Sequence, residues 1–230
     1  MTEIKLDAKL RTLTRLVVIG FASCFIIALT SLLITLNLRK HYVDSQSEDY
    51  AISGYHTMMR ELQLEYWKCK YDIVQEMDSY MKTVAENHNI SALELLNGCD
   101  KYSIDVRLAL AQGKVESHFG TQGLASKTNS VWNYKAFDGY KLNEIPKDGK
   151  YTHPNLSIEP YLKLIRESYL GDQKTERDLL NKFVNLSGKR YASNELYEQE
   201  LKLAWSEIDK TTKLDSLLNR YRYLKVEMTY

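Results

Sequence analysis

The longest apolar run in the chain lies near its N-terminus. Residues 16–36 read LVVIGFASCFIIALTSLLITL and carry no charge. At a rise of 1.5 Å per residue, about 21 helical residues span the roughly 30 Å of a bilayer core. A cleaved signal peptide would have a shorter apolar region of about 7–15 residues ending at small residues, whereas this run is followed by Arg39 and Lys40. We predict one transmembrane helix at residues 16–38.

The charges on either side of this span indicate its orientation. Four cations precede the span and two follow it: Lys5, Lys9, Arg11 and Arg15, then Arg39 and Lys40. An excess of cations favours the cytoplasmic side. We therefore expect residues 1–15 to be cytoplasmic and the large C-terminal part to be periplasmic or extracellular.

A helical pattern continues through residues 39–89. Apolar residues recur mostly three and four apart, at Ile52, Tyr55, Met59, Leu62, Tyr66, Cys69, Ile73, Met77, Tyr80 and Val84. This spacing predicts one or two long amphipathic helices. Two interpretations stay open: a stalk that forms a homodimer through residues 50–84, or the first helix of the folded domain, since the stripe is broad and aromatic rather than a strict leucine heptad.

A shorter amphipathic helix is predicted after Asp105, which can cap it. Its apolar stripe is Ile104, Leu108, Ala111, Val115 and Phe119, and Gly120 is expected to end it. Glu116 then lies in the last turn. The helix dipole and the apolar neighbours Phe119 and Trp132 are both expected to favour its protonated form. A carboxyl group that stays protonated near neutral pH suits a general acid for cleaving a glycosidic bond.

The order of several segments resembles a known family. The segments are YSIDVRLALAQGKVESHFG, TQGLASKTNSVWNYKAF, SIEPYLKLIRESYL and GKRYASNELYEQELKLAWSEI, which together cover about Tyr102 to Ile208. This order is similar to the glucosaminidase-type peptidoglycan hydrolases, including flagellar muramyl hydrolases and autolysins, which have a lysozyme-like helical fold. The resemblance implies that Glu116 is the catalytic acid and that Tyr191 is the tyrosine of the cleft.

The resemblance also has departures. The family usually has two asparagines and then an aromatic-glycine pair where this chain reads Asn129-Ser130-Val131-Trp132-Asn133. We expect Gln112, Asn129 and Trp132 to line the substrate cleft, with contacts that differ from those of the family. Many members place a second carboxylate in a small β-lobe. The corresponding stretch contains three carboxylates, Asp138, Glu144 and Asp148. None of them matches a motif, so the second catalytic group is unassigned.

The remaining sequence completes a mainly α prediction. We expect a lysozyme-like domain at residues 90–210 and a helical tail at 211–230. Helices are predicted from Ser157 to near Gly171, from Thr175 through Val184, and from Asn194 through Trp205. Residues 133–160 are rich in turn-forming residues, and a small β-hairpin lobe is expected there.

Composition excludes some functions and leaves one pairing open. A formal net charge of +1 gives no argument for binding nucleic acid. The five histidines show neither HExxH nor zinc spacing with cysteine, and phosphate-loop and G-x-S-x-G motifs do not occur. We therefore expect neither a metal nor another cofactor. Cys69 and Cys99 both fall in the exported part and are either a disulfide or two reduced buried thiols.

The sequence thus predicts a membrane-anchored peptidoglycan hydrolase that cuts the glycan strand as an N-acetylglucosaminidase does. Its partners would be the glycan strand and, through residues 16–38, a lipid bilayer. A lytic transglycosylase, in which Glu116 acts first as acid and then as base, is one alternative. The other is an inactive wall-binding or virion structural protein that has kept the fold, which would place the span in a viral membrane.

Overall fold

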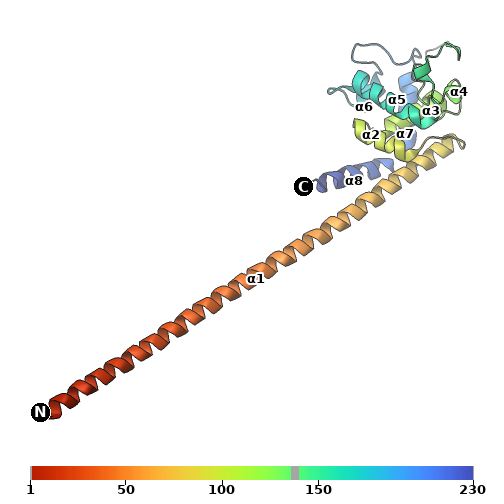
Figure 1. Ribbon diagram of the computed structural model, residues 1–230. Helices are drawn as coiled ribbons and strands as arrows, with labels where there is room; N and C mark the ends of the chain where they lie inside the picture. The colour runs from red at the N-terminus through yellow and green to blue at the C-terminus, as the bar shows by residue number, and fades with distance from the viewer. Residues whose placement is uncertain (1, 136–139, 230) are drawn as a thin grey trace. The chain divides into compact units, whose positions relative to one another are not determined.

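The computed structural model describes the backbone of residues 2–135 and 140–229, and the side chains of these residues from 26 onward except 45–49 and 51. The chain divides into two units, Met1–Glu61 and Leu62–Tyr230 (Figure 1). Helix α1, Thr2–Val84, supplies all of the described backbone of the first unit and the first element of the second.

The predicted transmembrane span, residues 16–38, begins outside the residues whose side chains are described. Within the part that is described, no helix has both the length and the apolar character needed to cross a membrane. Cys24, a residue of this apolar run, has a side chain outside the described ones as well.

Helix α3, Val106–Ser117, is the centre of the second unit. It packs against α7, Tyr197–Thr211, and α2, Ala92–Tyr102. The sequence predicted a single apolar stripe, but every residue from Val106 to Gly113 is buried. A helix that is buried on all sides is a core helix rather than a surface one. The helix becomes partly exposed only in its last turn, at Lys114, Val115 and Glu116.

The predicted C-terminal helices are present with different bounds. The helix after Ser157 consists of α5, Ile158–Leu164, and its π-helical continuation η3, Ile165–Leu170, and it ends at Gly171 as expected. Helix α6, Glu176–Asn181, has a capping box of Thr175 and Asp178 but is shorter than predicted, because Lys182 has an extended backbone. The helix expected from Asn194 begins at Tyr197, as α7.

The β-hairpin lobe expected in residues 133–160 is not found in the described part of that stretch. Its regular elements are two short 3₁₀ helices, η1, Lys147–Gly149, and η2, Pro154–Ser157, and the first residues of α5. Pro146 precedes η1 and Pro154 is the first residue of η2, and proline cannot donate a hydrogen bond to a strand ladder. Over the described chain the β-structure is limited to one isolated bridge, between Val184 and Arg190.

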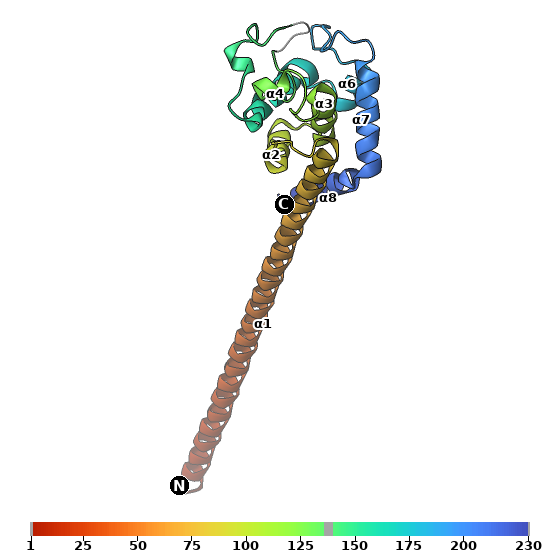
Figure 2. The same cartoon turned by 90° about the vertical axis from the view of Figure 1, so that its right-hand side faces the viewer.

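Residues 62–84 of α1 and helix α8, Leu214–Glu227, lie side by side (Figure 2). The rings of Tyr66 and Tyr221 stack at 5.1 Å, and their hydroxyl oxygens are 2.9 Å apart. The disulfide considered for Cys69 and Cys99 is absent, since both are free, buried thiols. The Cys69 thiol instead donates to the Leu217 carbonyl of α8 at 3.4 Å.

Candidate active site

Glu116 lies in the last turn of α3, as the sequence predicted. The helix does not end at Gly120, however. His118 takes the left-handed conformation, with a φ of 48°, and Phe119 follows with a φ of 55°. The Phe119 amide donates back to the Gly113 carbonyl at 2.9 Å, which closes the helix. This tight end fixes the backbone two residues after the carboxylate.

Two donors from distant parts of the chain hold the partly buried carboxylate of Glu116. The Tyr197 hydroxyl donates to its Oε1 at 2.6 Å. The side-chain amide of Asn133 donates to its Oε2 at 3.1 Å and to its backbone carbonyl at 3.0 Å. Both carboxylate oxygens therefore have a directed hydrogen-bond partner, and the orientation of the group is set by α7 and by the segment after α4, Ala125–Thr128.

A chain of hydrogen bonds runs from the core to this carboxylate. The Tyr161 hydroxyl donates to Gln112 Oε1 at 2.5 Å, and Gln112 Nε2 donates to the Tyr197 hydroxyl at 2.9 Å. The Tyr197 hydroxyl then donates to Glu116. Burial, followed by the charge of Glu116, raises the pKa of Tyr197 well above its usual value. Its hydroxyl therefore keeps its proton and remains a donor at physiological pH.

Tyr191, the tyrosine predicted for the cleft, lies beside this chain. Its ring stacks on that of Tyr197 at 5.7 Å, and its hydroxyl donates to the Trp132 carbonyl at 2.9 Å. Burial, followed by the charge of Glu116, raises the pKa of Tyr191. The structure thus brings Tyr191 close to the catalytic candidate, while its hydroxyl is bonded to the main chain.

The other predicted substrate residues lie behind or beside the carboxylate. Gln112 and Trp132 are both 0% exposed, so neither side chain contacts a ligand in this conformation. Trp132 stacks on Tyr161 at 4.4 Å and donates through its indole nitrogen to the Ala109 carbonyl at 2.9 Å. Asn129, which is partly exposed, ends α4, Ala125–Thr128, and donates to the Tyr151 carbonyl at 2.9 Å.

Gly113, one turn before Glu116 on α3, is required by close packing. A Cβ atom there would lie 2.9 Å from the Phe119 ring and 3.4 Å from the Trp132 indole nitrogen. The close approach in this structure is thus by two core side chains. The missing Cβ lets the chain fold back after α3, which brings Phe119 under the turn that carries Glu116.

The candidates for a second carboxylate are placed differently. Glu144 is exposed and accepts a hydrogen bond from the Lys141 amide at 2.6 Å. Asp148 forms an ion pair with Lys135. Asp138 lies outside the described residues. The second catalytic group therefore stays unassigned.

Sequence reasoning missed Tyr197, Asn133 and Tyr161. In the helical pattern from Asn194 through Trp205, Tyr197 is only an apolar position, although it is six residues after Tyr191 in the same segment of the family resemblance. Asn133 appears in the sequence only as part of the departure from the family pattern. One signal was available: Gln112 is a polar residue within a run of core positions, and a buried amide requires hydrogen-bond partners.

The family model described as Glucosaminidase, mannosyl-glycoprotein endo-beta-N-acetylglucosaminidase, matches residues 94–210. The match covers Glu116, its two donors and the rest of the hydrogen-bond chain. This protein belongs to the glucosaminidase family, which confirms the resemblance seen in the sequence. Membership supports a glycosidase that acts on peptidoglycan. Comparison with curated proteins and with solved structures gave no match.

Proposed function

We propose that this protein cleaves the glycan strand of peptidoglycan as an N-acetylglucosaminidase does, with Glu116 as the general acid. The observation that carries the proposal is the position of the Glu116 carboxylate and the two hydrogen bonds that it accepts. It lies at the end of the central helix of a glucosaminidase domain, and Tyr197 and Asn133 each donate to one of its oxygens. We further expect the domain to have a lysozyme-like arrangement of helices.

The two donors favour release of the proton. A protonated Glu116 gives its proton to the glycosidic oxygen as the bond between that oxygen and the anomeric carbon breaks; a water molecule then supplies the oxygen that bonds to this carbon, and its released proton restores the acid. Transfer of the first proton leaves a negative charge on Glu116. Hydrogen bonds to a carboxylate are stronger than those to a neutral carboxyl group, so Tyr197 and Asn133 stabilise the product of this step more than its start.

The buried residues act through Glu116 in this proposal. Gln112 orients the Tyr197 hydroxyl, and Trp132 presents the backbone carbonyl that orients Tyr191. Both are positioning residues. Tyr191 and Asn129 remain the predicted contacts with the reacting sugar, Tyr191 by orienting it or by stabilising its developing charge.

We also propose that residues 16–38 anchor the protein in a membrane, with residues 1–15 in the cytoplasm and the catalytic domain outside. The sequence of the span and its basic N-terminal flank support this topology. Protease added to spheroplasts should digest the chain beyond His41. Protection of that region would contradict the orientation, and with it access to the cell wall.

The test of the catalytic proposal is Glu116→Gln. The amide keeps the shape of the side chain but has no transferable proton, so release of fragments from purified peptidoglycan should fall by about 10²-fold or more. Glu195→Gln, an exposed carboxylate on the same domain, is the matched control and should have no effect. Near-normal turnover by a folded Glu116→Gln protein, with folding checked by circular dichroism, would show that the acid is wrongly assigned.

Mass analysis of the released fragments identifies the bond that is cut. Reducing MurNAc ends indicate a muramidase, and reducing GlcNAc ends indicate the glucosaminidase proposed here. Anhydro-MurNAc ends indicate a lytic transglycosylase. If the unmodified protein released no fragments, a non-enzymatic wall-binding role would be favoured instead.

A further inference from the structure

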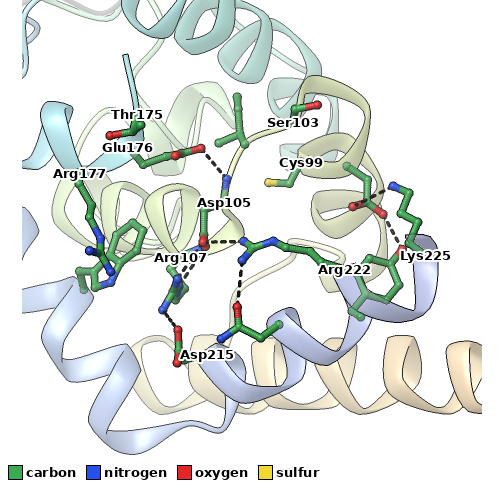
Figure 3. Close-up of a pocket in the computed structure, with 15 residues that line it drawn as sticks. Cys99, Ser103, Asp105, Arg107, Thr175, Glu176, Arg177, Asp215, Arg222 and Lys225 are labelled. Carbon is green, nitrogen blue, oxygen red and sulfur yellow. Dashed lines mark hydrogen bonds and ion pairs between the residues drawn. The ribbon is translucent and has the colours of Figure 1, made fainter. Parts of the chain in front are cut away.

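The N-terminal end of α3, the end away from Glu116, is tied to α8 by charged groups. The guanidinium of Arg107 donates to Asp105 at 2.9 Å and to Asp215 of α8 at 2.7 Å (Figure 3). Arg222 of α8 donates to the same Asp105 at 2.8 Å. Because charge-assisted bonds of this kind are strong, they fix this end of the helix. The hydrogen bonds to Glu116 then depend on how the segments opposite the other end are held.

Opposite the C-terminal end of α3, residues 130–133 form a tight turn that carries one of the two donors to Glu116. The Asn133 backbone N–H donates to the Ser130 carbonyl at 2.9 Å, which closes the turn. Asn133 has a φ of 49°, in the left-handed region that asparagine tolerates better than most residues. Its side-chain amide donates to both Glu116 Oε2 and the Glu116 carbonyl. The position of the turn therefore sets the position of this donor.

Three hydroxyl groups from other parts of the chain hold the main chain of this turn. The Ser117 hydroxyl donates to the Val131 carbonyl at 2.6 Å, and the Val131 N–H donates to the Ser157 hydroxyl at 3.3 Å. The Tyr191 hydroxyl donates to the Trp132 carbonyl at 2.9 Å. Ser117 and Ser157 are only 2% and 1% exposed, so water does not reach their bonds. Loss of either serine hydroxyl would leave a buried main-chain group of Val131 without a partner.

Ser117 differs from the other two because it is the residue next to Glu116. Its hydroxyl also accepts from the Gly120 N–H at 2.7 Å, so it joins the turn to the end of α3. The same junction is closely packed, since a Cβ atom at Gly120 would lie 3.2 Å from a methyl carbon of Val131. This hydroxyl therefore connects the helix that carries the acid to the turn that carries its donor.

We propose that Ser117 is a positioning residue of the active site. Its hydroxyl holds the turn 130–133 in the place where the Asn133 amide meets the carboxylate of Glu116. In this role Ser117 does not touch the substrate and acts only through Asn133. The effect on catalysis rests on the proposed function, whereas the effect on the Asn133 side chain does not.

The first test observes the Asn133 side chain directly, by nuclear magnetic resonance of the full-length protein with isotopically labelled asparagine. Its amide signal is identified as the one that Asn133→Gly removes. The amide nitrogen donates to two acceptors, so its protons should exchange slowly with water, and Ser117→Ala should raise the exchange rate by about 10-fold or more. An unchanged rate in a folded Ser117→Ala protein would overturn the proposal, whether or not the protein is a glycosidase.

The second test is a double-mutant cycle on the cleavage of purified peptidoglycan. Asn133→Gly removes the amide and keeps the left-handed backbone, which glycine adopts freely. We expect Ser117→Ala to lower kcat by about 10-fold with KM little changed, but by less than about twofold in the Asn133→Gly background. Equal losses in both backgrounds would show that Ser117 does not act through Asn133. If the unmodified protein cleaved nothing, the glycosidase would be refuted, and the exchange measurement would still decide the role of Ser117.

A matched control separates position from stability. Thr212, just beyond the end of α7 that lies away from Tyr197, also donates to a carbonyl, that of Ile208 at 2.7 Å, and accepts from an N–H, that of Leu214 at 3.2 Å. Thr212→Val should therefore lower the free energy of unfolding by a similar amount and leave kcat unchanged. An equal loss of kcat in Thr212→Val would overturn the proposal.

Ser157→Ala provides a second variant of the same turn. It removes the acceptor of the Val131 N–H instead of the donor to the Val131 carbonyl. If Ser117→Ala does not fold, Ser157→Ala takes its place in both tests with the same expected results. Unchanged exchange of the Asn133 amide, or equal losses of kcat with and without Asn133→Gly, would then overturn the proposal.

Discussion

Replacing Tyr197 by phenylalanine isolates the contribution of one hydroxyl to the candidate active site. That hydroxyl donates to Glu116 Oε1 at 2.6 Å and accepts from Gln112 Nε2 at 2.9 Å. The ring should stay in place, since Tyr197 is 4% exposed and packs on Phe183 and Tyr191. The substitution therefore removes two hydrogen bonds and little else.

The expected loss of stability follows from these two bonds. A hydrogen bond contributes about 0.5–1.5 kcal/mol between neutral groups and about 1.5–3 kcal/mol when one partner is charged, and a buried donor left without a partner costs about 1–3 kcal/mol. Gln112 is 0% exposed, so its amide has no access to water after the change. Since effects within one network are not additive, we expect the free energy of unfolding to fall by about 2–4 kcal/mol. Tyr191→Phe removes one neutral bond and should cost about 1 kcal/mol.

Activity should fall as well, because Glu116 loses one of the two donors that orient it and stabilise its charge. We expect kcat on purified peptidoglycan to decrease by about 10–100-fold, with KM little changed, since the interaction strengthens in the transition state. The assay is fragment release at a temperature where urea titration shows both variants folded. If Tyr197→Phe kept kcat within about twofold while Tyr191→Phe lost 100-fold, the orienting role of Tyr197 would be refuted and Tyr191 would be the catalytic tyrosine.

Two further substitutions and one labelling experiment test the packing, the charges and the thiols. Gly113→Ala should lower the free energy of unfolding by about 1–2 kcal/mol, because the new Cβ meets Phe119, which is 1% exposed. The cost of overpacking outweighs the roughly 1 kcal/mol gained in helix propensity. A variant that urea titration shows to be stabilised would contradict this prediction. Burial favours the protonated form of Asp105, but hydrogen bonds from Arg107 and Arg222 outweigh it and lower the pKa of Asp105 below its ordinary value of 3.8. The ionised Asp105 therefore stabilises the fold fully above pH 3.8, and this contribution is lost as the pH falls through the lower pKa of the folded state. The free energy of unfolding of Asp105→Asn should therefore fall less between pH 7 and about pH 3 than that of the unmodified protein. If it fell equally in both proteins, the stabilising role of ionised Asp105 would be contradicted. Burial raises the pKa of both Cys69 and Cys99, so iodoacetamide should label them only after unfolding, and a disulfide found by non-reducing mass mapping would contradict the structure.

The sequence located helix α3, which carries the candidate acid, because the information there is local. Asp105 caps α3 through a hydrogen bond to the Arg107 amide at 3.0 Å, and the apolar periodicity that follows fixes where the last turn falls. Neither signal depends on the rest of the fold. The prediction of a hairpin lobe was wrong because its signal does not specify local structure. Turn-forming residues show where the chain bends, but they do not show whether strands lie between the bends. Pro146 and Pro154 begin 3₁₀ turns instead.

The environment of Glu116 depends on contacts that no local pattern contains. Tyr197 is 81 residues away in sequence, and its partner Gln112 is 85 residues from it. The sequence does show that Gln112 lies among core positions, and a buried amide must be satisfied at both its oxygen and its nitrogen. Tyrosine can meet each need, by donating to the oxygen or by accepting from the nitrogen, and the chain has 17 of them. Only the packing of α7 and α5 against α3 selects Tyr197 and Tyr161, and this packing makes Gln112 an internal support of the carboxylate instead of a contact with the sugar.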